Sequence, residues 1–372
     1  MKKLISLLLI GSSVLLAACG NNDSMTAGES APPPPSMVFT MTNSMLGNTV
    51  QAYSRSRDGT LVNSASFPTG GTGVGHGLEN QGALASSNDG RFLYVVNPGS
   101  NDLTVFHVTD GGLEFADRVP SGGSLPVSVA EWNGTVYVLN RNDSSGAGTG
   151  PTIQGFQVSS SGRLSPLAGS HITLHATDTN AAQIAISPDG LWIVVTEHGS
   201  NQIDVLPLEQ SHVPGTPSTA DSAGSGPFGF AFSDTVRLYV SEAGAGTTSA
   251  YDLASQAALH ALSAAVPTQQ RATCWLVITP DNNFVYVSNT GSRTVSSYRI
   301  SHDGSLTELT SIAATTVGPP LDLIIDADGN YLSVLTTDGS IETFRITATS
   351  GSLTHIQTVS GLPSGTNGLA GR

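Results

Sequence analysis

The chain has 372 residues and a formal net charge of −14, and both of its lysines, Lys2 and Lys3, lie at the amino terminus. Without these two residues the net charge is −16, which disfavours nucleic acid and anionic membrane surfaces as partners because both repel an acidic protein. The absence of lysine from the rest of the sequence also excludes Schiff-base chemistry and a lysine general base there.

Residues 1–18 predict a secretory signal, with two lysines, an apolar run that is short for a membrane span, and small residues before a cysteine. Leu16-Ala17-Ala18-Cys19 resembles the bacterial lipobox, so we expect the mature chain to begin at a lipidated Cys19. The alternative is the cleaved signal of a soluble exported protein. Gly20 stands where an Asp would, by resemblance to Gram-negative lipoproteins, favour the inner membrane. We therefore expect attachment to the outer membrane, at its periplasmic face or at the cell surface, through the lipid alone.

Residues 19–36 predict a disordered tether that follows the lipidated cysteine. They are rich in Asn, Ser, Gly, Ala and Pro and have little apolar surface to bury. With Cys19 carrying lipid, Cys274 is the one remaining thiol, so an intramolecular disulfide is not possible. We expect residues 37–372 to form one domain that packing alone stabilises.

A repeated unit organises residues 37–372. Its clearest copy, residues 86–123, reads as a polar turn, an apolar strand that ends at Asn97, a polar loop, a second strand, an Asp-Gly turn and a third strand. The spacing of successive units, about 43 to 57 residues, is typical of propeller blades. The residues equivalent to Asn97, called marker residues below, are Asn43, Asn140, Glu197, Glu242, Asn289 and Thr336.

Seven units predict an all-β fold, a seven-bladed β-propeller whose closed ring leaves no long exposed sheet edge. The first unit, residues 38–68, accounts only for the second to fourth strands of a blade. Residues 367–370 can supply the missing inner strand, because the loop before them is similar to the loops at other inner strands, such as the one near residues 81–85. We therefore predict that the C-terminal strand joins the N-terminal blade and closes the ring.

Two glycine-containing motifs are similar to parts of known ligand sites. Residues 70–77 have glycine spacings found in phosphate loops, but no strand-to-helix pattern follows. Residues 326–330 are similar to part of a calcium loop, yet they lack its terminal Glu and coincide with a repeat turn. We expect neither a metal nor a cofactor.

The polar residues at the starts of inner strands and at the ends of second strands should meet at one mouth of the ring, which is where propellers usually bind ligands. These residues are His76, Asn80, Gln81, Asn140, Arg141, Gln183, Glu197, His198, Glu242, Arg271, Cys274, Asn289 and Asp322.

Glu197 and Glu242 are the foremost catalytic candidates, because they occupy marker positions where other blades have Asn. Two carboxylates facing one funnel could share general acid and base catalysis. Arg141 and Arg271 could stabilise an oxyanion, and His198 could relay a proton. The remaining residues of the mouth (His76, Gln81, Asn140, Gln183, Asn289 and Asp322) would contact substrate. The alternative is that each marker residue only caps a loop, and that Cys274 only packs.

Tyr94-Val95-Val96-Asn97, Tyr137-Val138-Leu139-Asn140 and Tyr286-Val287-Ser288-Asn289 resemble the YVTN repeats of lactonase-like seven-bladed propellers, a family that includes 6-phosphogluconolactonase and carboxymuconate cyclase. The resemblance extends over about residues 37–372 and implies the propeller fold. It also implies an active-site glutamate at Glu242, in Tyr239-Val240-Ser241-Glu242.

The chain departs from this family at two arginines. The Ser-Asn-Arg-Gly element of the phosphogluconolactonases is here Ser288-Asn289-Thr290-Gly291, and their Pro-Arg is Pro320-Leu321. These departures and the acidic composition disfavour a phosphorylated lactone.

The sequence therefore predicts a monomeric cell-envelope hydrolase of a non-phosphorylated lactone. The alternative is a non-catalytic propeller that binds a glycan, peptide or protein partner, for which Trp132, Trp192 and Trp275 would form an aromatic rim.

Overall fold

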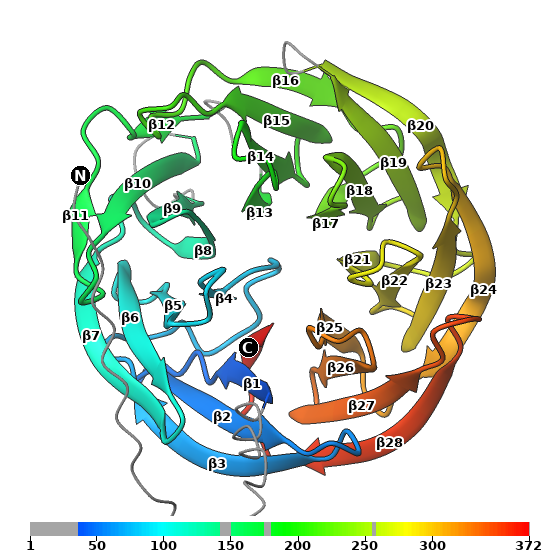
Figure 1. The fold of residues 1–372 in the computed structure, drawn as a ribbon, viewed down its shortest axis with the longest axis horizontal. Coiled ribbons are helices and arrows are strands. Elements are labelled where there is room, and N and C mark those ends of the chain that lie inside the picture. The colour runs from blue at the N-terminus through cyan, green and yellow to red at the C-terminus, as the bar shows by residue number, and fades with distance from the viewer. Residues whose placement is uncertain (1–35, 142–149, 175–179, 255–257, 372) are drawn as a thin grey trace, which may run out of the picture. The chain divides into compact units, whose positions relative to one another are not determined.

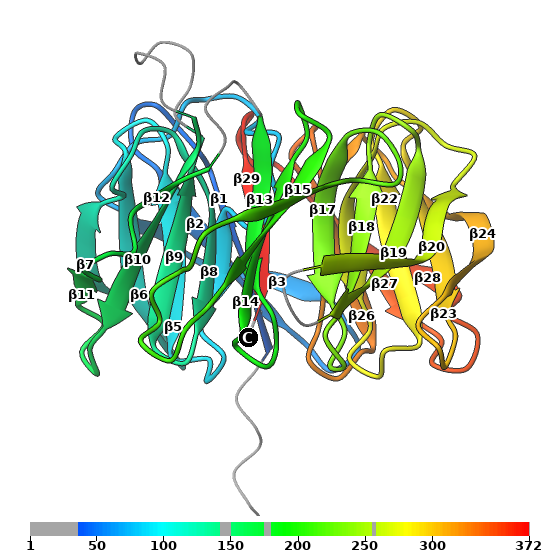
Figure 2. The same ribbon diagram turned by 90° about the horizontal axis from the view of Figure 1, so that it is seen from above.

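The computed structural model describes residues 36–141, 150–174, 180–254 and 258–371. The predicted signal, Cys19 and nearly all of the predicted tether lie outside these ranges. Strands are the regular elements of the described residues, among which there is no helix long and apolar enough to cross a membrane. The strands form seven sheets arranged as a ring around a central channel (Figures 1 and 2), which confirms the predicted propeller.

The blades are numbered here along the chain, and their strands follow one another from the centre outward. Blade 1 contains β29 (Asn367–Gly371), β1 (Ser36–Met41), β2 (Thr49–Arg55) and β3 (Leu61–Pro68); blade 2 contains β4 (Leu84–Ser86), β5 (Phe92–Asn97), β6 (Asp102–Thr109) and β7 (Gly112–Pro120). Blade 3 contains β8 (Pro126–Trp132), β9 (Thr135–Asn140) and β10 (Thr152–Val158), with β11 (Leu164–Pro166) and β12 (Ile172–Thr173) both paired to β10.

The remaining four blades are regular four-stranded meanders. Blade 4 contains β13 (Ala181–Ile186), β14 (Trp192–Glu197), β15 (Gln202–Pro207) and β16 (Ser218–Asp221); blade 5 contains β17 (Pro227–Phe232), β18 (Arg237–Glu242), β19 (Thr247–Ala254) and β20 (Ala258–Pro267). Blade 6 contains β21 (Thr273–Ile278), β22 (Phe284–Asn289), β23 (Thr294–Ile300) and β24 (Leu306–Thr315); blade 7 contains β25 (Pro320–Ile325), β26 (Tyr331–Thr336), β27 (Ser340–Ile346) and β28 (Leu353–Ser360).

The two ends of the ring share blade 1, as predicted. β29 pairs antiparallel with β1, with Ala370 opposite Phe39 and Gly371 opposite Val38. Leu369 and Val38 are buried in a core cluster that also contains residues of blade 7. Strand pairing and apolar packing between chain ends therefore close the ring.

The apolar cores lie between neighbouring blades, and a tyrosine of the second strand crosses each of several interfaces. The hydroxyl of Tyr239 donates to the carbonyl of Gly304 at 3.1 Å, that of Tyr286 to Gly351 at 2.7 Å, and that of Tyr331 to Arg57 at 2.9 Å. Each acceptor lies in the outer hairpin of the next blade. A Cβ at Gly351, where φ is +71°, would lie 2.6 Å from the Phe284 ring, so this turn requires glycine.

The loop between blades 1 and 2 enters the central channel (Figure 1). Its residues 77–82, called the channel segment below, contact inner strands of several blades: the Gln81 amide donates to Ala182 in blade 4 at 3.1 Å, and Trp275 in blade 6 donates through Nε1 to the Asn80 carbonyl at 2.7 Å. Because these residues leave the sheet, β4 begins at Leu84 rather than near Gln81 as the repeat predicts.

Candidate functional site

A cavity of about 390 Å³ opens at the end of the ring where the second strands finish. Residues of blades 4 to 7 line it, and the channel segment forms one of its walls. Of the residues that the sequence places at the mouth, His198 and Cys274 line this cavity. Its lining residues are Gly77, Glu79, Asn180, His198, Phe228, Ala243, Gly244, Ala272, Cys274, Trp275, Thr290 and Leu321.

A row of three rings crosses the cavity from blade 4 to blade 6. His198 meets Phe228 edge to face with ring centroids 5.9 Å apart, and Phe228 meets Trp275 in the same way at 5.0 Å. The Trp275 Nε1 atom donates a hydrogen bond to the Asn80 carbonyl of the channel segment. The row therefore presents apolar ring surface to the cavity, with an imidazole at one end.

His198 is the titratable residue of the cavity best suited to accept a proton. It is half-buried, and within the described residues its ring nitrogens make no hydrogen bond. Burial lowers the pKa of His198 below its ordinary value, the negative charge of Glu79 opposes this shift, and the positive charge of Arg141 adds to it. The imidazole is consequently neutral near pH 7.

Glu79 is a lining residue that sequence reasoning did not select. It is exposed and has a φ of +50°, an uncommon conformation for a residue other than glycine, asparagine or aspartate. The sequence signal for Glu79 was its position next to Asn80 and Gln81, in the loop before an inner strand, where mouth residues are expected. That signal was missed because the segment leaves the strand register, which repeat alignment assumes.

Arg141 supports the site from beside the cavity. Its Nη2 donates to the carbonyl of Glu79 at 2.7 Å, and its Nε donates to the carbonyl of Ala181 at 3.1 Å. The guanidinium thus joins the channel segment to blade 4, and its charge acts on His198. Its role in stabilising an oxyanion stays a prediction.

Cys274 lines the cavity but has the properties of a packing residue. Burial raises the pKa of its thiol to about 12, and its Sγ lies 3.2 Å from the carbonyl oxygen of Ala272. A thiol with this pKa is almost entirely protonated near pH 7 and is a poor nucleophile.

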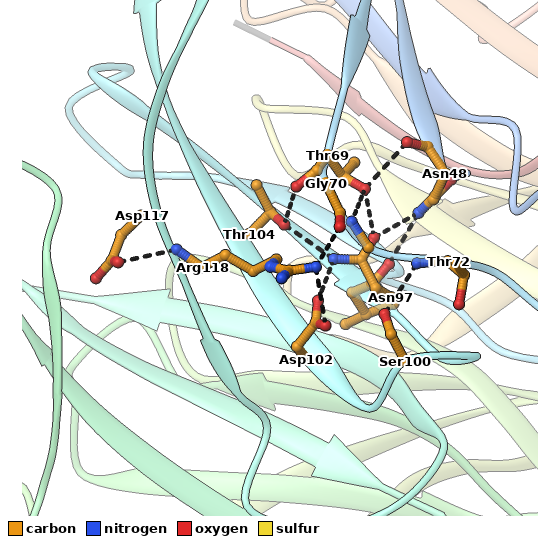
Figure 3. A network of polar contacts seen from close by, with 12 residues as sticks. Asn48, Thr69, Gly70, Thr72, Asn97, Ser100, Asp102, Thr104, Asp117 and Arg118 are labelled. Atoms are coloured by element: carbon orange, nitrogen blue, oxygen red, sulfur yellow. Dashed lines mark hydrogen bonds and ion pairs between the residues drawn. The ribbon is translucent and has the colours of Figure 1, made fainter. Parts of the chain in front are cut away.

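The marker residues form hydrogen-bond networks within the loops, as blade 2 shows (Figure 3). The side-chain oxygen of Asn97 accepts from Asn48 Nδ2 at 2.9 Å, and its nitrogen donates to Asp102 Oδ1 at 2.6 Å and to Thr104 Oγ1 at 2.9 Å. Asn289 makes the same two hydrogen bonds in blade 6. Its Nδ2 donates to the hydroxyls of the residues five and seven positions onward, Thr294 at 3.2 Å and Ser296 at 2.8 Å. The recurring network holds the hairpin between the second and third strands.

Glu242 occupies the equivalent network of blade 5. Its carboxylate accepts from Ser222 Oγ at 2.9 Å, from the Gly224 amide at 2.7 Å, and from the hydroxyls of Thr247 and Ser249. All four partners are donors, whereas Asn97 has the acceptor Asp102 at the corresponding place, which explains why a carboxylate replaces an amide here. Glu242 has no exposed surface, so the expectation that it faces a shared funnel is not supported.

Glu197 is also fully buried, and its Oε2 accepts from Ser200 Oγ at 2.8 Å within its own loop. Neither glutamate is among the described residues that line the cavity. Asn140 is likewise buried and donates to the carbonyl of Ser121 at 3.1 Å. For these marker residues the structure favours the loop-capping role over direct contact with substrate.

Gln81, Gln183 and Asp322 connect inner strands around the channel. Gln183 bonds both backbone groups of Phe230 in blade 5, with distances of 3.0 and 2.7 Å. Asp322 in blade 7 accepts the amide of Leu369 in β29 at 2.8 Å. Burial raises the pKa of Asp322 to about 7, although its backbone hydrogen bonds oppose the shift. These side chains are joined to the wall of the channel instead of facing the cavity.

His76 and Arg271 are exposed at the rim. The Nδ1 atom of His76 lies 3.0 Å from the Gly77 carbonyl oxygen, and Arg271 donates to the Gly291 carbonyl at 3.2 Å. Neither appears among the described lining residues, although each neighbours one of them along the chain.

A larger hollow of about 550 Å³ lies at the opposite end of the ring, between blades 2 and 3. Its charged residues have partners: Arg91 pairs with Asp89 at 2.6 Å, and Glu131 accepts the backbone amides of Asn88 and Gly134. The described residues also contain no group of three His, Cys, Asp or Glu side chains placed to bind a metal. The cavity beside His198 is therefore the better candidate site.

Comparison with solved structures shows the same fold in proteins of low sequence identity. A candidate 6-phosphogluconolactonase from Bacteroides uniformis is 20% identical with a TM-score of 0.74, and the alignment covers 91% of this chain and 99% of that one. A corresponding candidate from Bacteroides fragilis is 19% identical with a TM-score of 0.71, covering 92% and 99%. The periplasmic gluconolactonase PpgL from Pseudomonas aeruginosa is 17% identical with a TM-score of 0.71, covering 90% and 98%.

The comparison with curated proteins gave no match. Residues 41–150 and 216–367 match the family described as lactonase, seven-bladed β-propeller. These ranges make up more than half of the chain. The chain belongs to the lactonase family of seven-bladed β-propellers.

Proposed function

We propose that this protein hydrolyses a lactone in the cavity beside His198. The observation that carries the proposal is a half-buried imidazole in a concave site: burial and the charge of Arg141 lower its pKa, the charge of Glu79 opposes them, and its ring nitrogens make no hydrogen bond within the described residues. A neutral imidazole near pH 7 is suited to general base catalysis. Membership of the lactonase family supports the same class of reaction.

In the proposed step, the neutral His198 ring takes a proton from water as the water oxygen bonds to the lactone carbonyl carbon. The carbonyl oxygen becomes an oxyanion, which the positive charge of Arg141 stabilises from beside the cavity without contacting it. When the oxyanion collapses, the ring C–O bond breaks and the departing alkoxide takes the proton back from His198. The product is a hydroxy acid, whose carboxyl group is ionised at pH 7.

Glu79 has the supporting role in this mechanism. Its negative charge raises the pKa of His198 against the effect of burial, so it stabilises the imidazolium formed as water is deprotonated. The proposal therefore gives His198 the base role that the sequence suggested for Glu197 and Glu242, and Glu79, which is exposed at the cavity, supports it.

The proposed substrate is not phosphorylated. The described lining residues include neither arginine nor lysine, and the whole chain is strongly acidic. A phosphate group would lose its hydration in this cavity without gaining a cation in contact with it.

We also propose that the protein acts in the cell envelope as a monomer anchored to the outer membrane by lipid on Cys19. Support comes from the lipobox-like Leu16-Ala17-Ala18-Cys19 and from Gly20. Metabolic labelling with palmitate and membrane fractionation test this. The native chain should be labelled in the outer membrane fraction, and Cys19→Ser should not be labelled at all.

The alternative, a non-catalytic binding propeller with an aromatic rim, requires its three tryptophans to lie at one end of the ring. Trp132 ends an inner strand, Trp192 begins a second strand, and Trp275 lies near the start of an inner strand. Because the second strand of each blade runs antiparallel to its inner strand, Trp132 and Trp192 lie at one end of the ring and Trp275 at the other. The three side chains therefore do not form one aromatic rim.

The decisive experiment measures acid release by the full chain in a pH-stat across aldonolactones, alkyl lactones and aromatic lactones. His198→Asn should reduce kcat at least about a hundredfold, the usual contribution of a general base. His171→Asn is the matched control, because His171 is exposed on an outer strand region. Full activity in a folded His198→Asn variant would contradict the mechanism.

A further inference from the structure

Beyond the ring-opening reaction, the two ends of the cavity differ in chemistry. The end at blade 4 carries His198 and Asn180, and the charge of Glu79 on the channel segment acts on both His198 and Cys274. The end at blades 6 and 7 is formed by Ala272, Trp275 and Leu321.

The apolar end has few polar groups available to a ligand. The Trp275 Nε1 donates to Asn80, and the hydroxyl of Thr290 donates to the Pro320 carbonyl at 2.8 Å. The Cys274 thiol faces the Ala272 carbonyl at 3.2 Å. A sugar ring placed at this end would give up hydrogen bonds to water for its hydroxyl groups and would find these nearby polar atoms already paired.

The apolar end continues into a rigid core. Phe228, Cys274 and Trp275 belong to one buried apolar cluster, and the half-buried Ala243, Ala272 and Leu321 pack against that cluster at its surface. A ligand group placed there would cover apolar side chains that now border the cavity. Such burial stabilises a complex in proportion to the apolar area removed from water.

The channel segment limits the cavity on its inner side. Gln81 makes hydrogen bonds of 2.9 and 3.1 Å to Leu276, and Asn80 accepts from Trp275, so this wall is attached to blade 6. A substrate bound with its carbonyl near His198 must place its remaining atoms along the row of rings toward Trp275 and Leu321.

We infer that the substrate is a lactone with an apolar alkyl or aryl substituent, whose carbonyl lies at His198 and whose substituent lies against Phe228, Trp275 and Leu321. This inference rests on the proposed lactone hydrolysis and specifies its substrate class. Unsubstituted polar aldonolactones would leave the apolar end filled with water and would bind weakly.

The test uses the full chain and γ-lactones that differ only in the alkyl group, from γ-valerolactone through γ-hexalactone to γ-octalactone, with D-glucono-δ-lactone as the polar comparison. Burial of each added methylene should raise kcat/KM about fourfold, hence roughly sixtyfold over the three methylenes from the methyl to the butyl member. D-Glucono-δ-lactone should be the poorest substrate of the series.

Leu321→Arg tests the position of the substituent, because a guanidinium at the apolar end should abolish the rise in kcat/KM with chain length. Leu309→Arg is the matched control: Leu309 is 39% exposed on β24, on the outer side of blade 6, and this variant should retain the rise. If Leu321→Arg retains it as well, the substituent does not lie there and the assignment is wrong.

The possible outcomes separate the two proposals. Turnover without a rise along the alkyl series would overturn the inference and leave lactone hydrolysis standing. If no lactone is hydrolysed, the proposed function fails, and calorimetric binding of the same series then decides the inference. Affinity that rises with chain length in the native chain but not in Leu321→Arg would support an apolar ligand site, and affinity independent of chain length would refute it.

Discussion

The side chain of Gln81, in the channel segment before blade 2, bridges to Leu276 in blade 6. Its Nε2 donates to the Leu276 carbonyl at 2.9 Å, and its Oε1 accepts the Leu276 amide at 3.1 Å. The two residues are 195 positions apart in sequence, and their blades are not neighbours in the ring. One amide therefore holds the channel segment in place and fixes the inner wall of the candidate site.

Gln81→Leu is expected to lower the free energy of unfolding by about 2 to 3 kcal/mol, because both backbone groups of Leu276 lose a buried partner. Urea denaturation measures the change. Gln157→Leu is the control, since Gln157 is exposed and bonds only the Gly134 carbonyl by its side chain. Equal stability of the two variants would show that the bridge contributes nothing.

Glu242→Gln is expected to destabilise the fold by about 3 kcal/mol, because an amide NH₂ group would face donors that now bind a carboxylate. The kcat of the folded fraction should be nearly unchanged, since Glu242 has no exposed surface. Thermal unfolding and turnover are measured on the same preparation, with the exposed Glu114→Gln as control. A stable but inactive Glu242→Gln variant would restore the catalytic role expected from the sequence.

Leu369→Ala is expected to lower the free energy of unfolding by about 2 to 4 kcal/mol, because it leaves a cavity where β29 packs against blade 7. Deletion of residues 367–372 should do more and open the ring, since β1 would lose its inner partner. Limited proteolysis of the deletion variant should cut within blade 1 first. Native-like resistance to protease after deletion would contradict closure by this strand.

Stability should fall as the pH rises from about 4 to 7, owing to Asp322. Burial raises its folded-state pKa to about 7, whereas an unfolded aspartate titrates near 3.8, so the folded chain holds more protons throughout this interval. Thermal unfolding of native protein and Asp322→Asn across this pH range measures the contribution. The variant should show the flatter profile, and parallel profiles would exclude Asp322 as the cause.

The pH dependence of hydrolysis should reflect the pKa of His198. Because its pKa is lowered by burial, the neutral base persists below the usual range of histidine, and kcat/KM should remain high down to a pH below 6.5 before it falls. Glu79→Gln removes the charge that raises this pKa, so the acidic limb should move to still lower pH. A shift in the opposite direction would exclude the assigned role of Glu79.

The candidate site shows where repeat alignment stops being informative. Alignment correctly groups Asn97, Glu242 and Asn289 as equivalent residues, but equivalence says nothing of the direction in which a side chain points. Their partners five and seven residues onward lie across a hairpin, so the side chains complete loop networks instead of facing the channel. His198 follows a marker residue and was found by the same alignment, whereas Glu79 lies in a segment that interrupts the repeat.

By itself the sequence determined the seven-bladed ring and its closure, because blade-length periodicity, strand alternation and turn glycines are local signals repeated many times along the chain. Only the tertiary structure decided which polar residues meet at the cavity. That outcome depends on contacts between residues far apart in sequence, such as Gln81 with Leu276 and Asn80 with Trp275, which bring Glu79 to the same cavity as His198. No local pattern encodes these contacts, since they arise once the ring has closed around the channel segment.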